Sequence, residues 1–210
     1  MAPHRNTITE SVMKKVLVLG STGLVGSALV EKLKGSAEVV EASFNHAENP
    51  FDISNPESLK ALFEKVGKVD AILCTAGVVN MSDWATADDS EWEFGIHNKM
   101  MGQINTMRFG EKYVNDGGAI VLSTGVLAQY PFKGSSIVTT VNAAVEAAVK
   151  SAAVEVERIR FNAVSPGWVA ETMVAMGMDP EPGMPAADVA QHYIDLMNES
   201  TSGDVVVAMK

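Results

Sequence analysis

Residues 15–26, K-V-L-V-L-G-S-T-G-L-V-G, decide the fold of this chain. The run at 15–19 is almost continuously apolar, which predicts a strand buried on both faces of a parallel sheet. The spaced glycines that follow predict a sharp turn into a helix, with a backbone that a ligand can approach closely. Free N–H groups at the helix start favour an anion, so we expect a phosphate site here rather than a purely structural turn.

Strand-like and helix-like segments alternate along the remaining sequence. Apolar runs predict further strands at 38–42, 70–74, 119–122, 160–164 and 205–208. Helical spacing predicts helices at 27–34, 58–66, 92–114, 138–156 and 185–197. This order predicts an α/β fold, a Rossmann-type doubly wound parallel sheet in a single three-layer domain. Residues 1–13 are polar and aperiodic, so we expect a flexible N-terminal tail followed by a domain at 14–210.

The composition is typical of a globular domain, with 47% hydrophobic and 20% charged residues in a chain of 210. A net charge of −10 argues against nucleic acid and anionic membranes as partners, and is otherwise a solubility feature. The single Cys74 lies in an apolar run and is expected to be a buried, reduced thiol. No apolar run approaches the ~20 residues of a membrane span and no signal-peptide core is present, so we expect a cytoplasmic protein.

Several further residues fall where a dinucleotide would need them. Asp52, expected to follow a third strand, is suited to accept a hydrogen bond from an adenine amino group, although an N-cap role is equally open. The small residues Thr75, Ala76 and Gly77 allow close approach to adenine and ribose. Together with the glycine turn, they predict a dinucleotide partner.

The end of the second strand decides between NADP and NAD, because an acidic residue there binds the ribose 2′-hydroxyl and repels a 2′-phosphate. Ser43 is placed at this position, with Asn45 close behind it. The missing acid favours NADP, although no Arg or Lys is present to bind the phosphate. A shifted register would bring in Glu41 and reverse the preference.

Together these motifs resemble the short-chain dehydrogenase/reductase family from Val16 to Met209. The resemblance extends to H-N-K at 97–99, S-T-G at 123–125, R-F-N-A-V-S-P-G-W-V at 160–169, P-A-A-D-V-A at 185–190 and S-G-D-V-V-V at 202–207. It implies hydride transfer between a nicotinamide cofactor, NADP or NAD, and a small carbonyl or alcohol substrate of unknown identity. The cofactor-binding residues that the motifs and the resemblance indicate are Gly20, Ser21, Thr22, Gly23, Leu24, Val25, Gly26, Ser43, Asn45, Asp52, Ile53, Thr75, Ala76, Gly77, Asn142, Pro166, Gly167 and Val169.

The resemblance breaks at the family's Tyr-x-x-x-Lys pair, whose places hold Val138 and Asn142. Val138 has no titratable group, and Asn142 can at most hydrogen-bond to the ribose. The resemblance still implies that Asn98 supports a proton-relay water and that Ser123 or Thr124 orients the substrate. Compact bacterial members that lack the pair share G-Q-I-N, found here at 102–105, so the chain resembles that Lin1944-like subgroup, whose function is undetermined.

Two side chains are candidates to replace the missing acid. Tyr130, with Lys133 three residues on, would reach the nicotinamide if its loop folds inward, and otherwise is a surface or packing Tyr. His97 lies beside Asn98, but adjacent helix residues point in different directions, which favours a surface His. The acidic run at 88–93 has no His at metal-ligand spacing, so no metal site is predicted.

The sequence leaves three functions open. The first is an NAD(P)(H)-dependent oxidoreductase with an atypical active site. The second is a non-catalytic NAD(P)(H)-binding sensor or scaffold, and the third is a subunit whose catalytic groups come from another chain. The helix at 138–156 is small-sided enough for close helix packing, and the resemblance implies that it forms a dimer face with the helix at 92–114. This predicts a homodimer or homotetramer, although the Ala residues could instead pack under the sheet. The Met residues at 173, 176, 178 and 184 are interpreted either as an adaptable pocket lining or as filler.

Overall fold

A computed structural model describes residues 13–210, so the predicted tail, apart from Met13, lies outside the described residues. Six parallel strands form one sheet in the order β2-β1-β3-β4-β5-β6. Their bounds are β1 (Lys14–Leu19), β2 (Ala37–Ala42), β3 (Val69–Cys74), β4 (Val114–Ser123), β5 (Arg160–Pro166) and β6 (Val205–Ala208). Each of the six strands predicted from an apolar run is present, and β4 is longer than expected.

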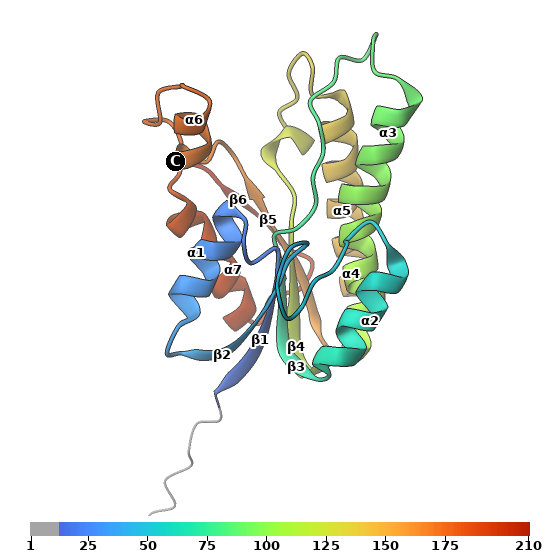
Figure 1. The fold of residues 1–210 in the computed structure, drawn as a ribbon, viewed down its shortest axis with the longest axis vertical. Coiled ribbons are helices and arrows are strands. Elements are labelled where there is room, and N and C mark those ends of the chain that lie inside the picture. The colour runs from blue at the N-terminus through green and yellow to red at the C-terminus, as the bar shows by residue number, and fades with distance from the viewer. Residues whose placement is uncertain (1–12) are drawn as a thin grey trace, which may run out of the picture.

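Helices cover both faces of the sheet, as Figure 1 shows. On one face lie α1 (Leu24–Leu33) and α7 (Ala186–Asn198), with the short α6 (Ala170–Ala175) above them. On the other face lie α2 (Pro56–Val66), α3 (Asp89–Gly95), α4 (Gly102–Gly110) and α5 (Ser136–Glu155). This arrangement confirms the predicted doubly wound, three-layer α/β fold.

The alternation of side chains along β1 explains the two cores. Val16 and Val18 pack into the cluster under α1 and α7, whereas Leu17 and Leu19 pack into the cluster under α2, α4 and α5. Successive strand residues point to opposite faces, so a strand covered on both sides must be apolar throughout. This is why the run at 15–19 predicted the buried strand correctly.

The long helix predicted at 92–114 is wrong in its continuity and in both ends. The helix begins at Asp89, where the Asp88 side chain and Glu91 form a capping box. It is then interrupted by a π-helical segment, η1 (Ile96–Met101), before continuing as α4. A 3₁₀ turn, η2 (Glu111–Tyr113), ends it, and Val114 already belongs to β4. A π-helical turn carries an additional residue, which the apolar pattern does not reveal.

Two connections also differ from expectation. The third strand expected before Asp52 is reduced to a single parallel bridge between Ser43 and Pro50. The Met-rich segment after Val169, in which no helix was predicted, contains α6 and pairs back through a bridge between Val169 and Met184. Both segments lie beyond the carboxyl ends of strands, where loops carry function rather than packing.

Helix α5, at 20 residues, is long and apolar enough by composition to cross a membrane, contrary to the expectation that no segment has that length. In this fold it is a core helix, because one face packs on β5 and η1. That face buries the polar side chains of Asn142 and Glu146 as well as a row of valines. The helix therefore forms part of the globular domain.

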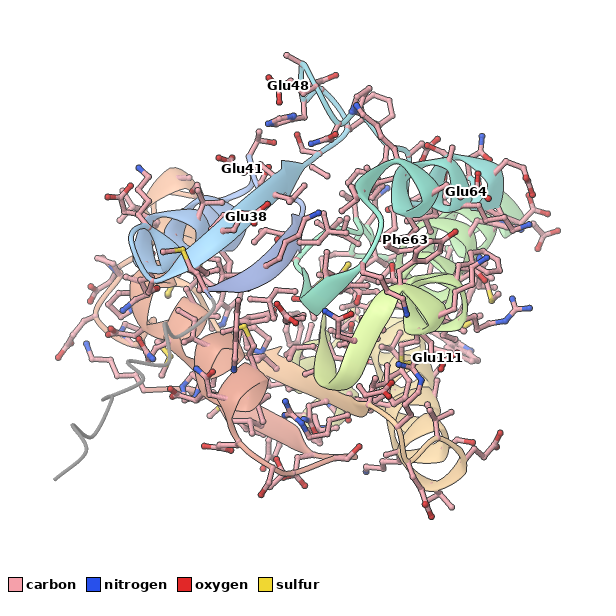
Figure 2. All side chains as sticks on the ribbon, turned by 90° about the horizontal axis from the view of Figure 1, so that it is seen from below. Glu38, Glu41, Glu48, Phe63, Glu64 and Glu111 are labelled. Carbon is pink, nitrogen blue, oxygen red and sulfur yellow. The ribbon has the colours of Figure 1, made fainter. Side chains whose placement is uncertain are left out.

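The acidic charge lies on the outside of the domain, as the side-chain view in Figure 2 shows. Glu38 and Glu41 lie on the open edge strand β2, and Glu64 points outward from α2. Phe63, next to Glu64, is buried instead and stacks on Tyr113 at a ring distance of 5.9 Å. Charges on an edge strand oppose pairing with another sheet edge.

Candidate functional site

The main candidate site is a cleft of about 430 Å³ beyond the carboxyl ends of β1, β2 and β3. The chain passes from β1 to β2 on one side and returns to β3 on the other, so the strand order reverses at β1. Ligands of open α/β sheets bind at such a switch point. The cleft is lined by Gly20, Thr22, Gly23, Ser43, Phe44, Phe51, Asp52, Ile53, Ser54, Thr75, Ala76, Gly77, Val78 and Asn98.

The glycine turn between β1 and α1 has the geometry that its spacing predicted. Gly20 has φ +88°, and a Cβ on it would lie 2.8 Å from the backbone nitrogen of Ala76. A Cβ on Gly26 would lie 2.0 Å from the carbonyl oxygen of Gly20, so only glycine lets α1 pack this closely on the turn. The Gly20 and Ser21 N–H groups donate to the Ala42 carbonyl and tie the turn to β2.

The start of α1 presents unpaired backbone donors to the cleft. Its N-cap is Gly23, which provides no side-chain hydrogen bond, and the first turn contains no acidic residue. The hydroxyls of Ser21 and Ser43 are buried, and within residues 13–210 neither has a hydrogen-bond partner. A cradle of glycine, free N–H groups and unpartnered hydroxyls can bind a phosphate.

Asp52 lies on the opposite side of the cleft from the turn. Its Oδ1 accepts hydrogen bonds from the Ser54 backbone N–H at 2.9 Å and the Ser54 hydroxyl at 2.7 Å. These bonds fix the orientation of the carboxylate, and Asn55 rather than Asp52 caps α2. The arrangement allows Oδ2 to accept from a ligand amino group.

The end of β3 forms the floor of the cleft. Thr75 donates its hydroxyl to the carbonyl oxygens of Leu19 and Gly20, and Gly77 has φ +112°. Asn98 Oδ1 accepts the Val78 N–H at 2.6 Å, so the side chain of Asn98 fixes the loop that follows Gly77. Small side chains and a fixed loop leave space for a planar ring.

Several predicted cofactor residues do not line the cleft. Leu24, Val25 and Gly26 belong to α1, where Val25 packs toward the core. Asn45 is exposed and lies outside the lining, which instead contains Phe44, a side chain with 70% of its surface exposed. The apolar lining from Phe44 and Phe51 was missed at the sequence level, although the letters F-N and F-D next to Ser43 and Asp52 were a signal.

A second group of predicted residues meets beyond β4 and β5. Asn142 from α5 approaches Gly125, on which a Cβ would lie 2.9 Å from Asn142 Nδ2 and 3.7 Å from the Pro166 carbonyl oxygen. Gly167 donates its N–H to Ala208, and a Cβ on it would lie 2.7 Å from Met209. Val169 is held by the bridge to Met184. Position 125, rather than 123 or 124, therefore faces Asn142.

The hydroxyls of Ser123 and Thr124 have other partners. Ser123 Oγ forms a 2.6 Å hydrogen bond with the Tyr193 hydroxyl from α7, on the opposite face of the sheet. Burial raises the pKa of Tyr193 well above its ordinary value. Thr124 is buried and donates to Glu146 Oε1 at 3.0 Å. Each hydroxyl serves packing between a helix and a strand.

The two candidates for the missing acid lie on the surface. Tyr130 is 65% exposed, and no hydrogen bond of its hydroxyl is present in the described part of the chain. His97 is exposed, and its Nδ1 lies 2.8 Å from the Glu93 carbonyl oxygen of the preceding turn. Lys133 lies near Tyr130 in sequence but lines a separate cavity.

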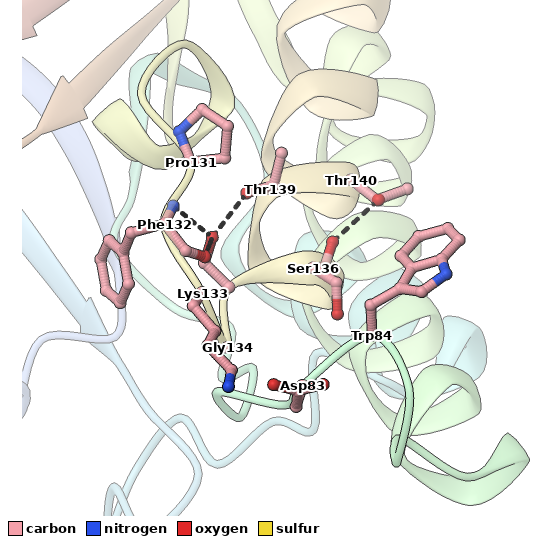
Figure 3. Close-up of a pocket in the computed structure, with 10 residues that line it drawn as sticks. Asp83, Trp84, Pro131, Phe132, Lys133, Gly134, Ser136, Thr139 and Thr140 are labelled. Atoms are coloured by element: carbon pink, nitrogen blue, oxygen red, sulfur yellow. Dashed lines mark hydrogen bonds between the residues drawn. The ribbon is translucent and has the colours of Figure 1, made fainter.

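That separate cavity, of about 420 Å³, lies between the loop after β3 and the first turn of α5 (Figure 3). Asp83 and Trp84 contribute from the loop, and Trp84 is 75% exposed. Ser136, Thr139 and Thr140 line the helix side, and each of their hydroxyls has a local hydrogen-bond partner: the Ser82 carbonyl, the Ser135 hydroxyl and the Ser136 carbonyl, respectively. The cavity is open, and its lining is mostly apolar.

One charged residue, which the sequence analysis did not single out, is buried beside the cleft. Lys99, in η1, is only 6% exposed, and burial lowers its pKa to about 8. One turn on, Gln103 donates to the Ala76 carbonyl at 2.6 Å and accepts the Ser123 N–H at 3.2 Å, which ties β3 to β4. Cys74 is free and buried, as predicted, and burial raises the pKa of its thiol to about 11.

Comparison with known proteins places this geometry among dehydrogenases and reductases. A family model described as enoyl-(acyl carrier protein) reductase matches residues 19–208. A short-chain dehydrogenase/reductase from Pestalotiopsis microspora, GME11373, is 25% identical over 207 residues, which cover 86% of this chain and 74% of that protein.

Two solved structures are similar over almost their full length. The protein lin1944 from Listeria innocua is 34% identical, with a TM-score of 0.88 over 92% of this chain and 98% of that one. A small-chain dehydrogenase in complex with NADPH is 27% identical, with a TM-score of 0.83 over 93% of this chain and 96% of that one.

Proposed function

Because this chain belongs to the short-chain dehydrogenase/reductase family, we propose that it is an oxidoreductase of that family which binds NADP(H) or NAD(H) in the cleft beside Gly20. The observation that carries the proposal is the glycine turn at the switch point of the sheet. Gly20 and Gly26 leave no room for a Cβ, while the start of α1 and the buried hydroxyl of Ser21 present unsatisfied polar groups. These groups fit a pyrophosphate.

The remaining residues of the cleft fit the other parts of a dinucleotide. Asp52 would accept from the adenine amino group, Thr75, Ala76 and Gly77 would form the wall beside adenine and ribose, and Phe44 would cover the adenine ring. At the far end, Pro166, Gly167 and Val169 would hold the nicotinamide. A bound nicotinamide supplies or accepts a hydride at a small carbonyl or alcohol carbon.

We further propose that NADP(H) is the preferred form. Ser43 lines the cleft at the end of β2, whereas Glu41 lies one strand period back, where its charge acts on Lys34. Among residues 13–210, the end of β2 therefore presents Ser43 rather than a carboxylate to the cleft, and the buried Ser43 hydroxyl has no partner there, so it can bind an oxygen of the 2′-phosphate.

The proposed active site is atypical. At the meeting point of α5 with the ends of β4 and β5 lie Val138, Asn142 and Gly125, none of which carries a titratable side chain. Proton exchange with the substrate oxygen then depends on a group outside this trio, or on solvent. Tyr130, Ser123, Thr124 and Asn98 remain candidates for substrate contact in a ligand-bound state.

The same trio favours a second function, a non-catalytic sensor or scaffold that reports the redox state of the nucleotide. A site that keeps its phosphate turn but has no proton donor would bind without turnover. A panel of small aldehydes and ketones with NADPH or NADH separates the two functions. Nucleotide oxidation that scales with enzyme concentration supports the oxidoreductase, and binding without any turnover supports the sensor.

Nucleotide binding itself is tested by titration with NADPH and NADH, followed by calorimetry. The variant Asp52→Asn keeps the Oδ1 acceptor for Ser54 but replaces Oδ2 by an amide N–H₂, which cannot accept from adenine. We expect about tenfold weaker binding, from the loss of one hydrogen bond to a charged group. Asp83→Asn is the matched control, since Asp83 Oδ1 likewise accepts a local N–H, from Ala85, but lies outside the cleft.

If the wild type binds neither nucleotide, both functions fail. If Asp52→Asn and Asp83→Asn bind the nucleotides with equal affinity, the assignment of Asp52 to the adenine end is wrong, while the proposed phosphate site at the glycine turn is unaffected. Assembly as a homodimer or homotetramer and a cytoplasmic location stay predictions, the first of them measurable by light scattering.

A further inference from the structure

Lys99 is an unusual residue for the inside of a protein. Its side chain is 6% exposed, and within residues 13–210 it forms no ion pair or hydrogen bond; Cys74 is the titratable group that acts on it electrostatically. A charge without a partner on so buried a side chain is unfavourable, so such a side chain points to a ligand. The proposed active site does not use it.

Lys99 lies at the end of β3, beside the cleft. A Cβ added to Gly77 would lie 3.1 Å from Lys99 Cδ and 3.4 Å from its Cα, so the Lys side chain runs directly behind a residue of the cleft floor. Gly77 allows this contact because it has no side chain. The Lys99 side chain therefore lies directly against the floor of the cleft.

Asn142 occupies the equivalent place at the end of β4, the neighbouring strand. Leu73 and Val121 are paired in the sheet, and Gly77 and Gly125 each follow four residues later. Lys99 contacts the first glycine and Asn142 approaches the second. Segment η1 also packs on α5. Just before it, Gly95 at the end of α3 faces Ile137 and Val141 of α5, one turn before Lys99, and Val141 is the neighbour of Asn142. The two polar side chains therefore lie at the same height.

Their hydrogen-bonding needs are complementary. The ammonium of Lys99 has three donors and no acceptor. Asn142 is 3% exposed, and its Oδ1 is an acceptor with no partner in the described part of the chain. A hydroxyl group satisfies both, because its oxygen accepts from Lys99 while its hydrogen is donated to Asn142. Within the proposed dinucleotide, the nicotinamide ribose carries hydroxyls at this end of the cleft.

We propose that Lys99 and Asn142 together bind a hydroxyl of the nicotinamide ribose, with Lys99 supplying from η1 the cation that position 142 of α5 does not carry. This inference rests on the proposed nucleotide binding. Lys99 is a positioning residue in it, and no covalent step is involved.

Calorimetric titrations at pH 7 test this assignment. The wild type, Lys99→Met, Lys99→Arg and the control Lys150→Met, an exposed lysine of α5, are each titrated with NADPH and with adenosine 2′,5′-bisphosphate, which lacks the nicotinamide ribose. We expect Lys99→Met to weaken NADPH binding about 10- to 100-fold, the range for a hydrogen bond from a charged donor, and to leave the bisphosphate unchanged. Lys99→Arg should retain part of the affinity, and Lys150→Met all of it.

The possible outcomes distinguish a failure of the Lys99 assignment from a failure of the proposed function. A Lys99→Met protein that binds NADPH within twofold of wild type overturns the assignment while the proposed function stands. Equal losses for NADPH and the bisphosphate, with a changed circular dichroism spectrum, mean that Lys99 is structural and also overturn it. If the wild type binds neither ligand, the proposed function fails and the assignment falls with it. As a second variant, Asn142→Leu should weaken NADPH about fivefold, and by less when Lys99 is already Met.

Discussion

Replacing Lys99 by Met should make the nucleotide-free protein more stable. Burial depresses the pKa of Lys99 from its ordinary 10.5 to about 8, which corresponds to roughly 3 kcal/mol at 1.36 kcal/mol per pKa unit. That amount is the cost of keeping the charged form in the fold below pH 8. Met has a similar length and no charge, so it fills the space behind Gly77 without that cost.

The pH dependence follows from the direction of the shift. Below about pH 8 Lys99 is protonated in both the folded and the unfolded state, so the full cost is present. Between pH 8 and 10.5 the unfolded state binds more protons, and the wild type therefore gains stability as pH rises. The difference between Lys99→Met and wild type should be largest at pH 7, should shrink above pH 8, and should disappear above 10.5.

Urea unfolding without nucleotide at pH 7 and pH 9.5 measures this difference. Lys150→Met serves as control, since an exposed lysine should change the free energy of unfolding by less than about 0.5 kcal/mol. A Lys99→Met protein less stable than wild type at pH 7 would falsify the reasoning, because it would mean that the ammonium already has a favourable partner in the fold. A stabilised variant that also loses NADPH affinity would identify a residue kept for binding at the expense of stability.

Four further outcomes are expected. NADPH affinity should fall as pH rises from 7 to 9.5 in the wild type, because Lys99 loses its proton near pH 8, and titrations of Lys99→Arg should show a flatter profile. Ser43→Asp should reverse the preference from NADPH to NADH, measured as the ratio of the two dissociation constants. Gly26→Ala should abolish binding and destabilise the fold by about 2 kcal/mol, whereas Gly35→Ala, whose Cβ meets open space, should cost only about 1 kcal/mol and leave binding intact. Tyr193→Phe should lower the free energy of unfolding by about 1 kcal/mol through the lost hydrogen bond, seen in urea titrations, with nucleotide affinity unchanged.

The fold and the geometry of the glycine turn were predictable because their signals are local. An apolar run followed by spaced glycines specifies a strand, a turn and a helix start within a dozen residues. The positions of Asp52 and Thr75 at the cleft could be predicted from how many residues separate them from the predicted strands. These are properties of the backbone path, which the sequence pattern determines directly.

The catalytic end was not predictable in the same way, because it depends on side-chain direction. Ser123 faces α7 on one side of the sheet, whereas Thr124 and Gly125 both face α5 on the other, toward Glu146 and Asn142 respectively. Similarly, H-N-K at 97–99 gives no sign that Lys99 is buried. Its direction depends on a π-helical turn that no apolar periodicity records.

Because of the π-helical turn η1, the direction of the Lys99 side chain depends on the number of residues in this helix. In a regular α-helix each residue rotates the chain by about 100°, so removing one residue between 96 and 101 would turn everything before it by that angle relative to Gln103. Lys99 would then leave the wall behind Gly77 without any change of residue type. In a comparison of homologous chains, a single-residue gap in this helix would therefore separate members with the buried cation from members without it, even where the lysine itself is retained.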